Sequence, residues 1–276
     1  MYKYKNIIIC GTYRSGTTII AKCLNEHPNL LVTNELFTYD KQNNNTFYNK
    51  FKIMRKEYPY VGECIFNSTL KDKRKLFLDK VLTDKKLSKK EIIDILVKYS
   101  GKDVIYYADK LPDYTFHLRR LISIMKDVKI VFCVRDARAV IESQIRNYYH
   151  KQKYDNLSIE EIILHHGWCK KNIDDCINMK ESWLTYMKEW EDIKRTHNIT
   201  YLEIYYRDLV SNKTKEAIRI ANFLKIDSKP LIQIFNQQFN PVNYNIWKNN
   251  IRNIDKKLPR EWKKMLIKYG YGVKYG

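Results

Sequence analysis

The sequence predicts an α/β fold in three layers, with a mainly parallel central sheet and a phosphate-binding loop after the first strand. Short apolar segments alternate with longer amphipathic ones, which is typical of parallel sheets covered by helices. A loop rich in Gly and Thr lies between the first strand and the first helix. The 276 residues are 44% hydrophobic. That suffices for one large core and no linker divides the chain, so we expect a single domain over 1–276.

The first half of the chain begins with an Ile-rich run at 5–10, which predicts a buried strand. Apolar residues at helical spacing predict a helix over 17–26, which His27 and Pro28 end. The helix expected at 88–99 opens with a capping box, Ser88 and Glu91. The other elements expected in this half are strands at 30–33 and 103–108, an exposed polar loop at 41–50, and helices at 68–82 and 114–125.

The second half repeats the alternation of strands and helices. Its clearest strand is 128–134, and a helix is expected to follow it at 137–149. A long helical region over 158–195 begins with a second capping box, Ser158 and Glu161. A strand at 199–205 and a helix at 209–224 follow. The last part is mixed, with breaks expected at Pro230, Pro241 and Pro259.

The sharpest local signal is Gly-Thr-Tyr-Arg-Ser-Gly-Thr-Thr at 11–18. Between a strand and a helix, backbone N–H groups and the positive end of the helix dipole attract an anion, and hydroxyl groups add hydrogen bonds. The pattern nearly fits the P-loop of kinases and NTPases. However, Thr17 occupies the position of the lysine that reaches the β- and γ-phosphates. We therefore predict a P-loop-like phosphate-binding loop with Arg14 as its basic residue. An ordinary turn that caps a helix is the alternative.

The form of this loop from Arg14 to Thr18 resembles the 5′-phosphosulfate loop of sulfotransferases that use 3′-phosphoadenosine 5′-phosphosulfate (PAPS). The segment 131–143 resembles the 3′-phosphate element of that family, in which a Ser follows eight positions after the first Arg of Arg-Asp-Pro-Arg. Arg135 and Ser143 have that spacing, with Ala137 in place of the usual Pro. The alternative for Arg135 is a surface ion pair with Asp136.

Three further segments extend the resemblance, so that it runs from residue 7 to about residue 250. Residues 109–112 are similar to the Asp/Asn-Lys-x-Pro element of the bacterial and tyrosylprotein branches. Residues 204–209 resemble the Tyr-Glu-Asp-Leu element, although Arg207 replaces the usual acid. Residues 240–247 resemble the region that closes over the donor. The order and spacing of these elements are more specific than any one motif.

The resemblance implies a role for each matching residue. The loop would hold the 5′-phosphosulfate, Arg135 and Ser143 the 3′-phosphate, and Tyr206 would lie near the adenine. Glu35 follows Arg14 by 21 positions, as the catalytic base does in the tyrosylprotein-like branch. The residues expected to act in catalysis are Glu35, Arg14 and Lys110. The residues expected to bind the donor are Arg14, Ser15, Gly16, Thr17, Thr18, Arg135, Ser143, Tyr206 and Asn243.

The acceptor stays open as a hydroxyl or amine group on an acidic molecule, a glycan, a lipid or a peptide. Phe37 stands where tyrosylprotein sulfotransferases have an Arg that reads acidic peptides, which weighs against tyrosine-peptide specificity. The formal net charge of +20 attracts polyanions. The abundance of Lys, Asn, Ile and Tyr is equally typical of an A/T-rich genome. We expect no nucleic-acid partner.

The cysteine spacing and the length of the apolar runs weigh against a metal-binding, a membrane-spanning or a secreted protein. The six cysteines form no Cys-x-x-Cys pair, and we expect no metal site. No apolar run reaches the roughly 18 residues of a membrane-spanning helix and no signal peptide is recognisable, so a cytoplasmic protein is expected. Three alternatives stay open: a P-loop kinase or NTPase, a non-catalytic polyanion-binding protein, and an inactive sulfotransferase-like fold.

Overall fold

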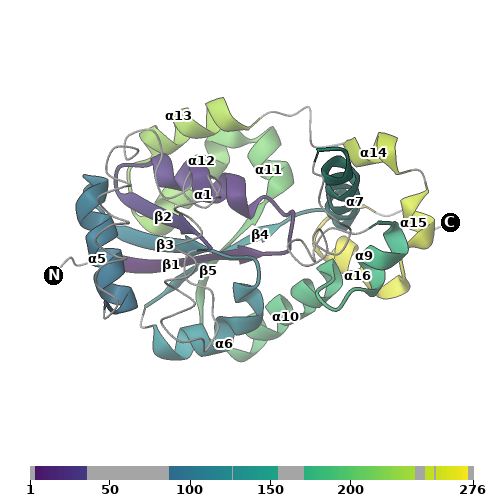
Figure 1. Ribbon diagram of the computed structural model, residues 1–276, viewed down its shortest axis with the longest axis horizontal. Helices are drawn as coiled ribbons and strands as arrows, with labels where there is room; N and C mark the ends of the chain where they lie inside the picture. Colours follow the sequence, from purple (N-terminus) through teal and green to yellow (C-terminus); the bar gives the residue numbers. More distant parts are fainter. Residues whose placement is uncertain are drawn as a thin grey trace.

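The computed structural model describes residues 4–35, 87–125, 127–154, 171–239, 246–251 and 253–272. Within these ranges, five strands form one parallel sheet in the order β2-β3-β1-β4-β5 (Figure 1). The strands are β1 (Lys5–Gly11), β2 (Leu30–Asn34), β3 (Tyr106–Lys110), β4 (Lys129–Val134) and β5 (Thr200–Tyr205). The predicted α/β fold with a mainly parallel sheet is therefore confirmed.

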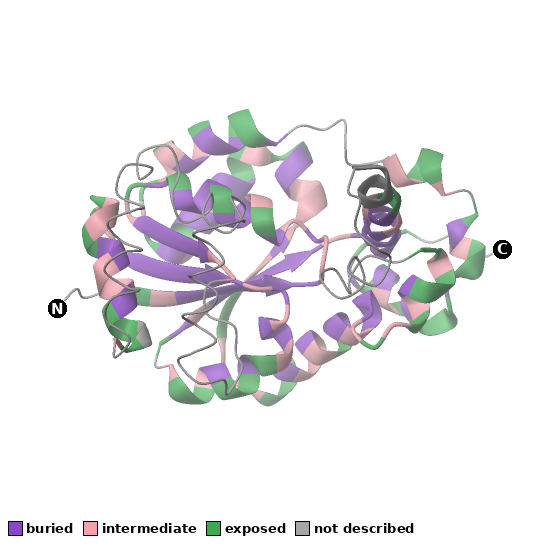
Figure 2. Cartoon of the chain, viewed as in Figure 1, coloured by how far each residue is buried: buried purple, intermediate pink, exposed green. Residues whose placement is uncertain are grey.

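The sheet has a hydrophobic core on each face. Side chains of a strand point alternately to the two faces. In β1, Ile7 and Ile9 accordingly join one core, while Ile8 and Cys10 join the other. Burial on both faces explains why β1 and β4 are continuous apolar runs. Figure 2 shows the central strands buried over most of their length, apart from the first residues of β1 and β4.

One face of the sheet is covered by four helices (Figure 1). They are α1 (Thr17–Glu26), α11 (Tyr206–Ser211), α12 (Lys213–Leu224) and α13 (Ser228–Gln238). The single helix expected at 209–224 is in fact two, because Asn212 leaves helical geometry with φ −135° and ψ 47°. The break expected at Pro230 is also wrong. Pro230 lies in the first turn of α13, where no intrahelical N–H bond is required.

The opposite face is covered by α6 (Tyr114–Ile124), α10 (Trp183–Thr196) and α16 (Arg260–Lys268). The Phe132 ring of β4 stacks on the Trp190 ring of α10, with centroids 4.2 Å apart. Helix α10 is the last part of the helical region expected over 158–195, and a turn separates it from α9 (Ile173–Asn178). Residues 155–170, the loop expected at 41–50 and the helix expected at 68–82 lie outside the described residues.

The remaining helices lie around the ends of the strands (Figure 1). They are α5 (Lys89–Ser100), α7 (Ala137–Tyr154), α14 (Ile246–Asn250) and α15 (Ile254–Lys257). The capping box of Ser88 and Glu91 is confirmed at the start of α5. Strand β3 begins later than the predicted 103–108 and continues through Asp109 and Lys110, which pair with β1 and β2. Lys110 therefore lies at the carboxyl edge of the sheet.

Lys102 supports the turn between α1 and β2. Its amino group donates to the carbonyl oxygens of Asn25, His27 (3.3 Å) and Leu30 (3.0 Å). Replacing it in Lys102→Met should lower the free energy of unfolding by about 2 kcal/mol, since these carbonyls lose a charged donor. Urea denaturation measures the loss, with Lys98→Met on the exposed face of α5 as the control. Equal stability of the two variants would contradict the role of Lys102.

Candidate functional site

The predicted phosphate loop connects the end of β1 to the start of α1. Its backbone bends sharply because Arg14 (φ 65°) and Gly16 (φ 97°) both adopt left-handed conformations. The Ser15 hydroxyl donates to the carbonyl of Thr12 at 2.7 Å and fixes the turn. The buried hydroxyl of Thr12 has no hydrogen-bond partner among the described residues. The loop therefore presents backbone N–H groups and a spare hydroxyl at the N-terminus of α1.

Tyr206 packs against this loop from the start of α11. A Cβ atom added to Gly16 would lie 2.6 Å from the Tyr206 ring, so a glycine is required for the ring to approach so closely. On its other side, the Tyr206 ring lies 4.4 Å from the guanidinium carbon of Arg135. The aromatic ring therefore links the phosphate loop to the end of β4.

Arg135 follows directly after β4 and contacts the loop itself. The Nη1 of Arg135 donates to the carbonyl of Arg14 at 2.9 Å. The backbone carbonyl of Arg135 accepts a hydrogen bond from the Trp183 indole at 3.0 Å. Its buried Nε has no hydrogen-bond partner within the described ranges. Burial lowers the pKa of the guanidinium. A buried cation with an unused donor is costly unless an anion binds it.

The alternative of a surface ion pair between Arg135 and Asp136 is wrong. Asp136 is buried and accepts hydrogen bonds from Arg138, at 2.9 Å from its Nε and 2.7 Å from its Nη2. The backbone N–H of Arg138 also donates to Asp136, which places this carboxylate at the start of α7. Arg138 further bonds Asp255 at 3.0 Å. Asp136 therefore pairs with Arg138 at the start of α7 and does not neutralise Arg135.

Ser143, two turns into α7, reaches the phosphate loop. The Arg14 side chain donates from Nε to the Ser143 hydroxyl at 2.9 Å, across 129 residues of sequence. The backbone carbonyl of Arg14 thus bonds Arg135, and the side chain of Arg14 bonds Ser143. The structure therefore brings Arg135 and Ser143, the two residues of the predicted 3′-phosphate element, together with the phosphate loop.

Glu35 and Lys110 meet at the ends of neighbouring strands β2 and β3. Lys110 is only 2% exposed, and its amino group donates to the Glu35 carboxylate at 2.7 Å; the Glu35 side chain is 43% exposed. The Glu35 N–H bonds the Lys110 carbonyl at 2.8 Å. Glu35 has φ 59°, a strained conformation for a non-glycine residue. Such strain is characteristic of functional positions, and the cation holds the carboxylate at the sheet edge.

A model described as the sulfotransferase family matches residues 6–230 of the chain. The chain belongs to the sulfotransferase family. Mouse (Mus musculus) sulfotransferase 1A1 is 28% identical over 97 residues, which are 35% of this chain and 31% of that protein. The match therefore spans about a third of that relative.

Two solved sulfotransferase structures resemble the chain along its whole length. The sulfotransferase domain of the Synechococcus PCC 7002 olefin synthase has a TM-score of 0.58 and 18% identity, over 99% of this chain and 98% of that one. The sulfotransferase domain of the curacin biosynthetic pathway has a TM-score of 0.61 and 15% identity, over 99% of both chains. These two likenesses establish the sulfotransferase fold, and family membership supports sulfotransferase activity.

The structure also gives the positions of the other residues that the sequence singled out. In the first turn of α1, Thr17 is buried and Thr18 is exposed. Asn243 lies outside the described residues. Arg207, the departure from the family pattern, stacks between the Tyr205 and Tyr271 rings. It also donates to the carbonyls of residues 269 and 270. Arg207 therefore holds the C-terminal segment, whereas its neighbour at 206 faces the phosphate loop.

Beside the loop lies a cluster that the sequence did not predict, made of Tyr13, Asp113 and Tyr186. The Tyr13 hydroxyl donates to the Asp113 carboxylate at 2.6 Å, and the Tyr186 hydroxyl donates to its other oxygen. Burial and the Asp113 charge raise the pKa of both phenols, so they stay protonated donors. The three residues come from distant segments, and no local pattern indicates their contact. Together they fix the residue that precedes Arg14.

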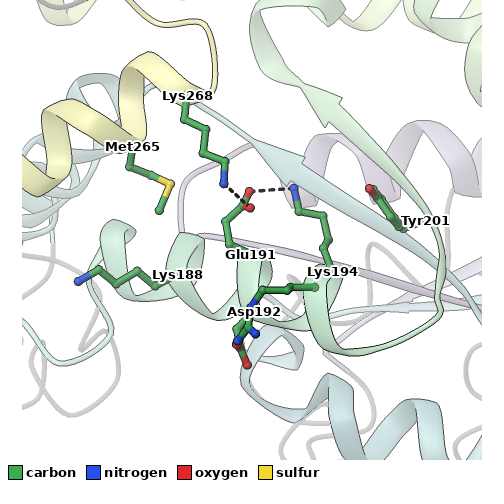
Figure 3. A pocket seen from close by; sticks show the side chains of 8 residues that line it. Lys188, Glu191, Asp192, Lys194, Tyr201, Met265 and Lys268 are labelled. Atoms are coloured by element: carbon green, nitrogen blue, oxygen red, sulfur yellow. Dashed lines mark hydrogen bonds and ion pairs between the residues drawn. The ribbon is translucent and has the colours of Figure 1, made fainter.

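A pocket of about 640 Å³ lies elsewhere, between α10, β5 and α16. Figure 3 shows that Lys194 and Lys268 on its walls both bond Glu191. Burial acts to raise the pKa of Glu191, but hydrogen bonds from Lys194, Lys268 and Tyr269 lower it to about 2. The other cations of the pocket, Lys188 and Arg195, are also paired with carboxylates. This pocket therefore lacks the uncompensated cation found at the phosphate loop.

The described part of the chain has neither a metal-binding cluster nor a membrane-spanning helix. No group of three or more His, Cys, Asp or Glu side chains there is arranged to hold a metal ion. None of the helices in the same ranges is long and apolar enough to cross a membrane.

Proposed function

We propose that the chain transfers a sulfonate group from PAPS to a hydroxyl or amine acceptor. The observation that carries this proposal is the Arg135 guanidinium, buried and bonded to the phosphate loop, with its Nε unused among the described residues. The unused hydroxyl of Thr12 adds a second donor. Unused buried donors in a basic loop fit an anionic ligand. Membership of the sulfotransferase family supports PAPS as that ligand.

Each part of the donor has a proposed partner. The loop from Arg14 to Thr18 binds the 5′-phosphosulfate through N–H groups and hydroxyls at the start of α1. Arg135 and Ser143 bind the 3′-phosphate. The Tyr206 ring, held between Gly16 and Arg135, lies against the adenine. Asn243 contributes from the segment that closes over the nucleotide.

The reaction is an in-line displacement at sulfur. The acceptor oxygen or nitrogen forms a bond to sulfur, while the bond from sulfur to the bridging phosphate oxygen breaks. Glu35 takes the acceptor proton, and Arg14 and Lys110 offset the charge on the leaving phosphate and the sulfonate oxygens. The leaving group is 3′,5′-adenosine bisphosphate. Atoms and charges balance with these groups, and we assign no metal ion to the step.

We also propose that residues 1–276 form one domain that works in the cytoplasm. Strands from residue 5 to residue 205 pair in a single sheet, which supports one domain. Cys10, Cys23, Cys133 and Cys176 are free thiols, as expected in a reducing compartment. The proposed partners are the nucleotide donor and one acceptor. The acceptor binds beside Glu35, and the residues there determine which class of acceptor is used.

Product analysis tests the proposed reaction. The protein is incubated with PAPS and separate panels of phenols, alcohols, amines, glycans, lipids and peptides. Mass spectrometry should detect one acceptor class that gains a sulfonate group, with an equal amount of 3′,5′-adenosine bisphosphate. A phosphorylated acceptor formed from ATP and Mg²⁺, with no sulfonated product from PAPS, would overturn the proposal.

A further inference from the structure

Arg146 lies one helical turn after Ser143 on α7. Residues three positions apart are neighbours on one helix face. The Nε of Arg146 donates to the Glu142 carboxylate at 2.9 Å. The same carboxylate oxygen accepts a hydrogen bond from Asn250 of α14, also at 2.9 Å. Arg146 is therefore held at a defined place beside the hydroxyl that meets the phosphate loop.

This ion pair differs from an ordinary surface pair on a helix. The Glu142 side chain is only 4% exposed, whereas the Arg146 side chain is 49% exposed. A buried carboxylate with two donors is fixed, so it can orient the guanidinium that it binds. Within the described ranges, Arg146 bonds through Nε alone. Its two terminal amino groups are left for a ligand.

Arg135 and Arg146 are near enough for the charge of one to act on the other. The pKa of Arg135 is lowered mainly by burial; the nearby charge of Glu142 acts to raise it and that of Arg146 to lower it further. Two cations whose charges act on each other repel unless an anion binds between them. One carboxylate, Glu142, compensates only one of the two charges. The arrangement suits a dianion better than a neutral hydroxyl.

We propose that Arg146 is a third group at the 3′-phosphate, beside Arg135 and Ser143, and that it makes the site select nucleotides with a 3′-phosphate. Glu142 and Asn250 position it. The inference rests on the proposed function, because it assigns a further residue to the same donor site. A nucleotide with a free 3′-hydroxyl gains nothing from Arg146.

Calorimetry with two nucleotides tests this role. Titrations at low ionic strength compare 3′,5′-adenosine bisphosphate with 5′-AMP, which lacks the 3′-phosphate. Arg146→Ala should weaken binding of the bisphosphate roughly tenfold, since a half-exposed charged contact is lost. Binding of 5′-AMP should change less than about twofold, because that ligand has no group for Arg146 to contact. Arg146→Lys should lose less than the alanine variant.

Two further variants separate positioning from general charge. Glu142→Gln keeps an acceptor but removes the ion pair, so it should weaken bisphosphate binding partly and leave 5′-AMP binding unchanged. Arg195→Ala is the matched control, since Arg195 also forms an intrahelical ion pair but lies on α10. It should bind both nucleotides like the unmodified protein. Thermal unfolding checks that each variant is folded.

The outcomes separate this inference from the proposed function. If Arg146→Ala binds the bisphosphate normally, or loses both nucleotides equally, the role of Arg146 is refuted. The proposed function stands in that case, provided that Arg135→Ala still weakens bisphosphate binding roughly hundredfold. If the unmodified, folded protein does not bind the bisphosphate, the proposed function fails, and the role of Arg146 fails with it.

Discussion

Replacing Arg135 with alanine is expected to raise the Kd of 3′,5′-adenosine bisphosphate roughly hundredfold, the effect of removing one partner of a buried charge pair. The guanidinium lies buried against Tyr206 and bonds the Arg14 carbonyl. Its unused Nε offers a donor to the 3′-phosphate. Titration calorimetry measures the change. Binding within threefold of the unmodified protein would contradict the assignment of Arg135.

Two controls distinguish this loss from a loss of fold. Ser143→Ala removes a neutral hydroxyl from the same place, and we expect a smaller effect, roughly fivefold in Kd. The melting temperature of ligand-free Arg135→Ala should fall little, because burial is unfavourable for this guanidinium and it forms no ion pair with a carboxylate of the described residues. A large fall would indicate that Arg135 mainly holds the loop together.

The Glu35→Gln variant should lose turnover by roughly a thousandfold, the contribution of a general base. Glutamine keeps an oxygen to accept the hydrogen bond from Lys110, so the strand ends stay joined. It cannot take a proton from the acceptor. Binding of 3′,5′-adenosine bisphosphate should stay within threefold, since Glu35 touches the acceptor side. The rate of sulfonated product formation measures the effect.

A structural role for Glu35 would give a different result. If the carboxylate served only to neutralise Lys110, Glu35→Gln would leave that cation free for the anionic donor, so donor binding would strengthen and the rate at saturating donor would stay nearly unchanged. The matched variant is Lys110→Met, which leaves Glu35 in place and removes the cation. It should slow turnover as well, through loss of charge stabilisation at the leaving phosphate. Full activity of Glu35→Gln would rule out Glu35 as the base.

The sequence was sufficient where the structure depends on local spacing. The strand, glycine loop and helix at 5–26 follow from an apolar run and two glycines, and the structure has them. The eight-residue step from Arg135 to Ser143 indicated that both approach one site, and both contact Arg14. The position of Glu35 beside Lys110 follows from parallel strands that end at one edge.

The sequence was insufficient where contacts join distant segments. Adjacency suggests that Asp136 pairs with Arg135, but the start of α7 turns Asp136 toward Arg138. The bond between Tyr13 and Asp113 spans 100 residues, and no periodicity indicates it. The break at Asn212 depends on its backbone conformation rather than on a proline or glycine. Tertiary packing determines each of these features.

The defining property that we propose for this site is that the loop at 11–18 and Arg135 bind a 3′-phosphorylated adenine nucleotide. Its most direct test is titration calorimetry of the unmodified protein with 3′,5′-adenosine bisphosphate, set against ATP with Mg²⁺. We predict micromolar binding of the bisphosphate and no comparable binding of ATP with Mg²⁺, since Thr17 replaces the lysine of kinase loops. Binding of ATP with Mg²⁺ and none of the bisphosphate would contradict the account and favour a P-loop kinase.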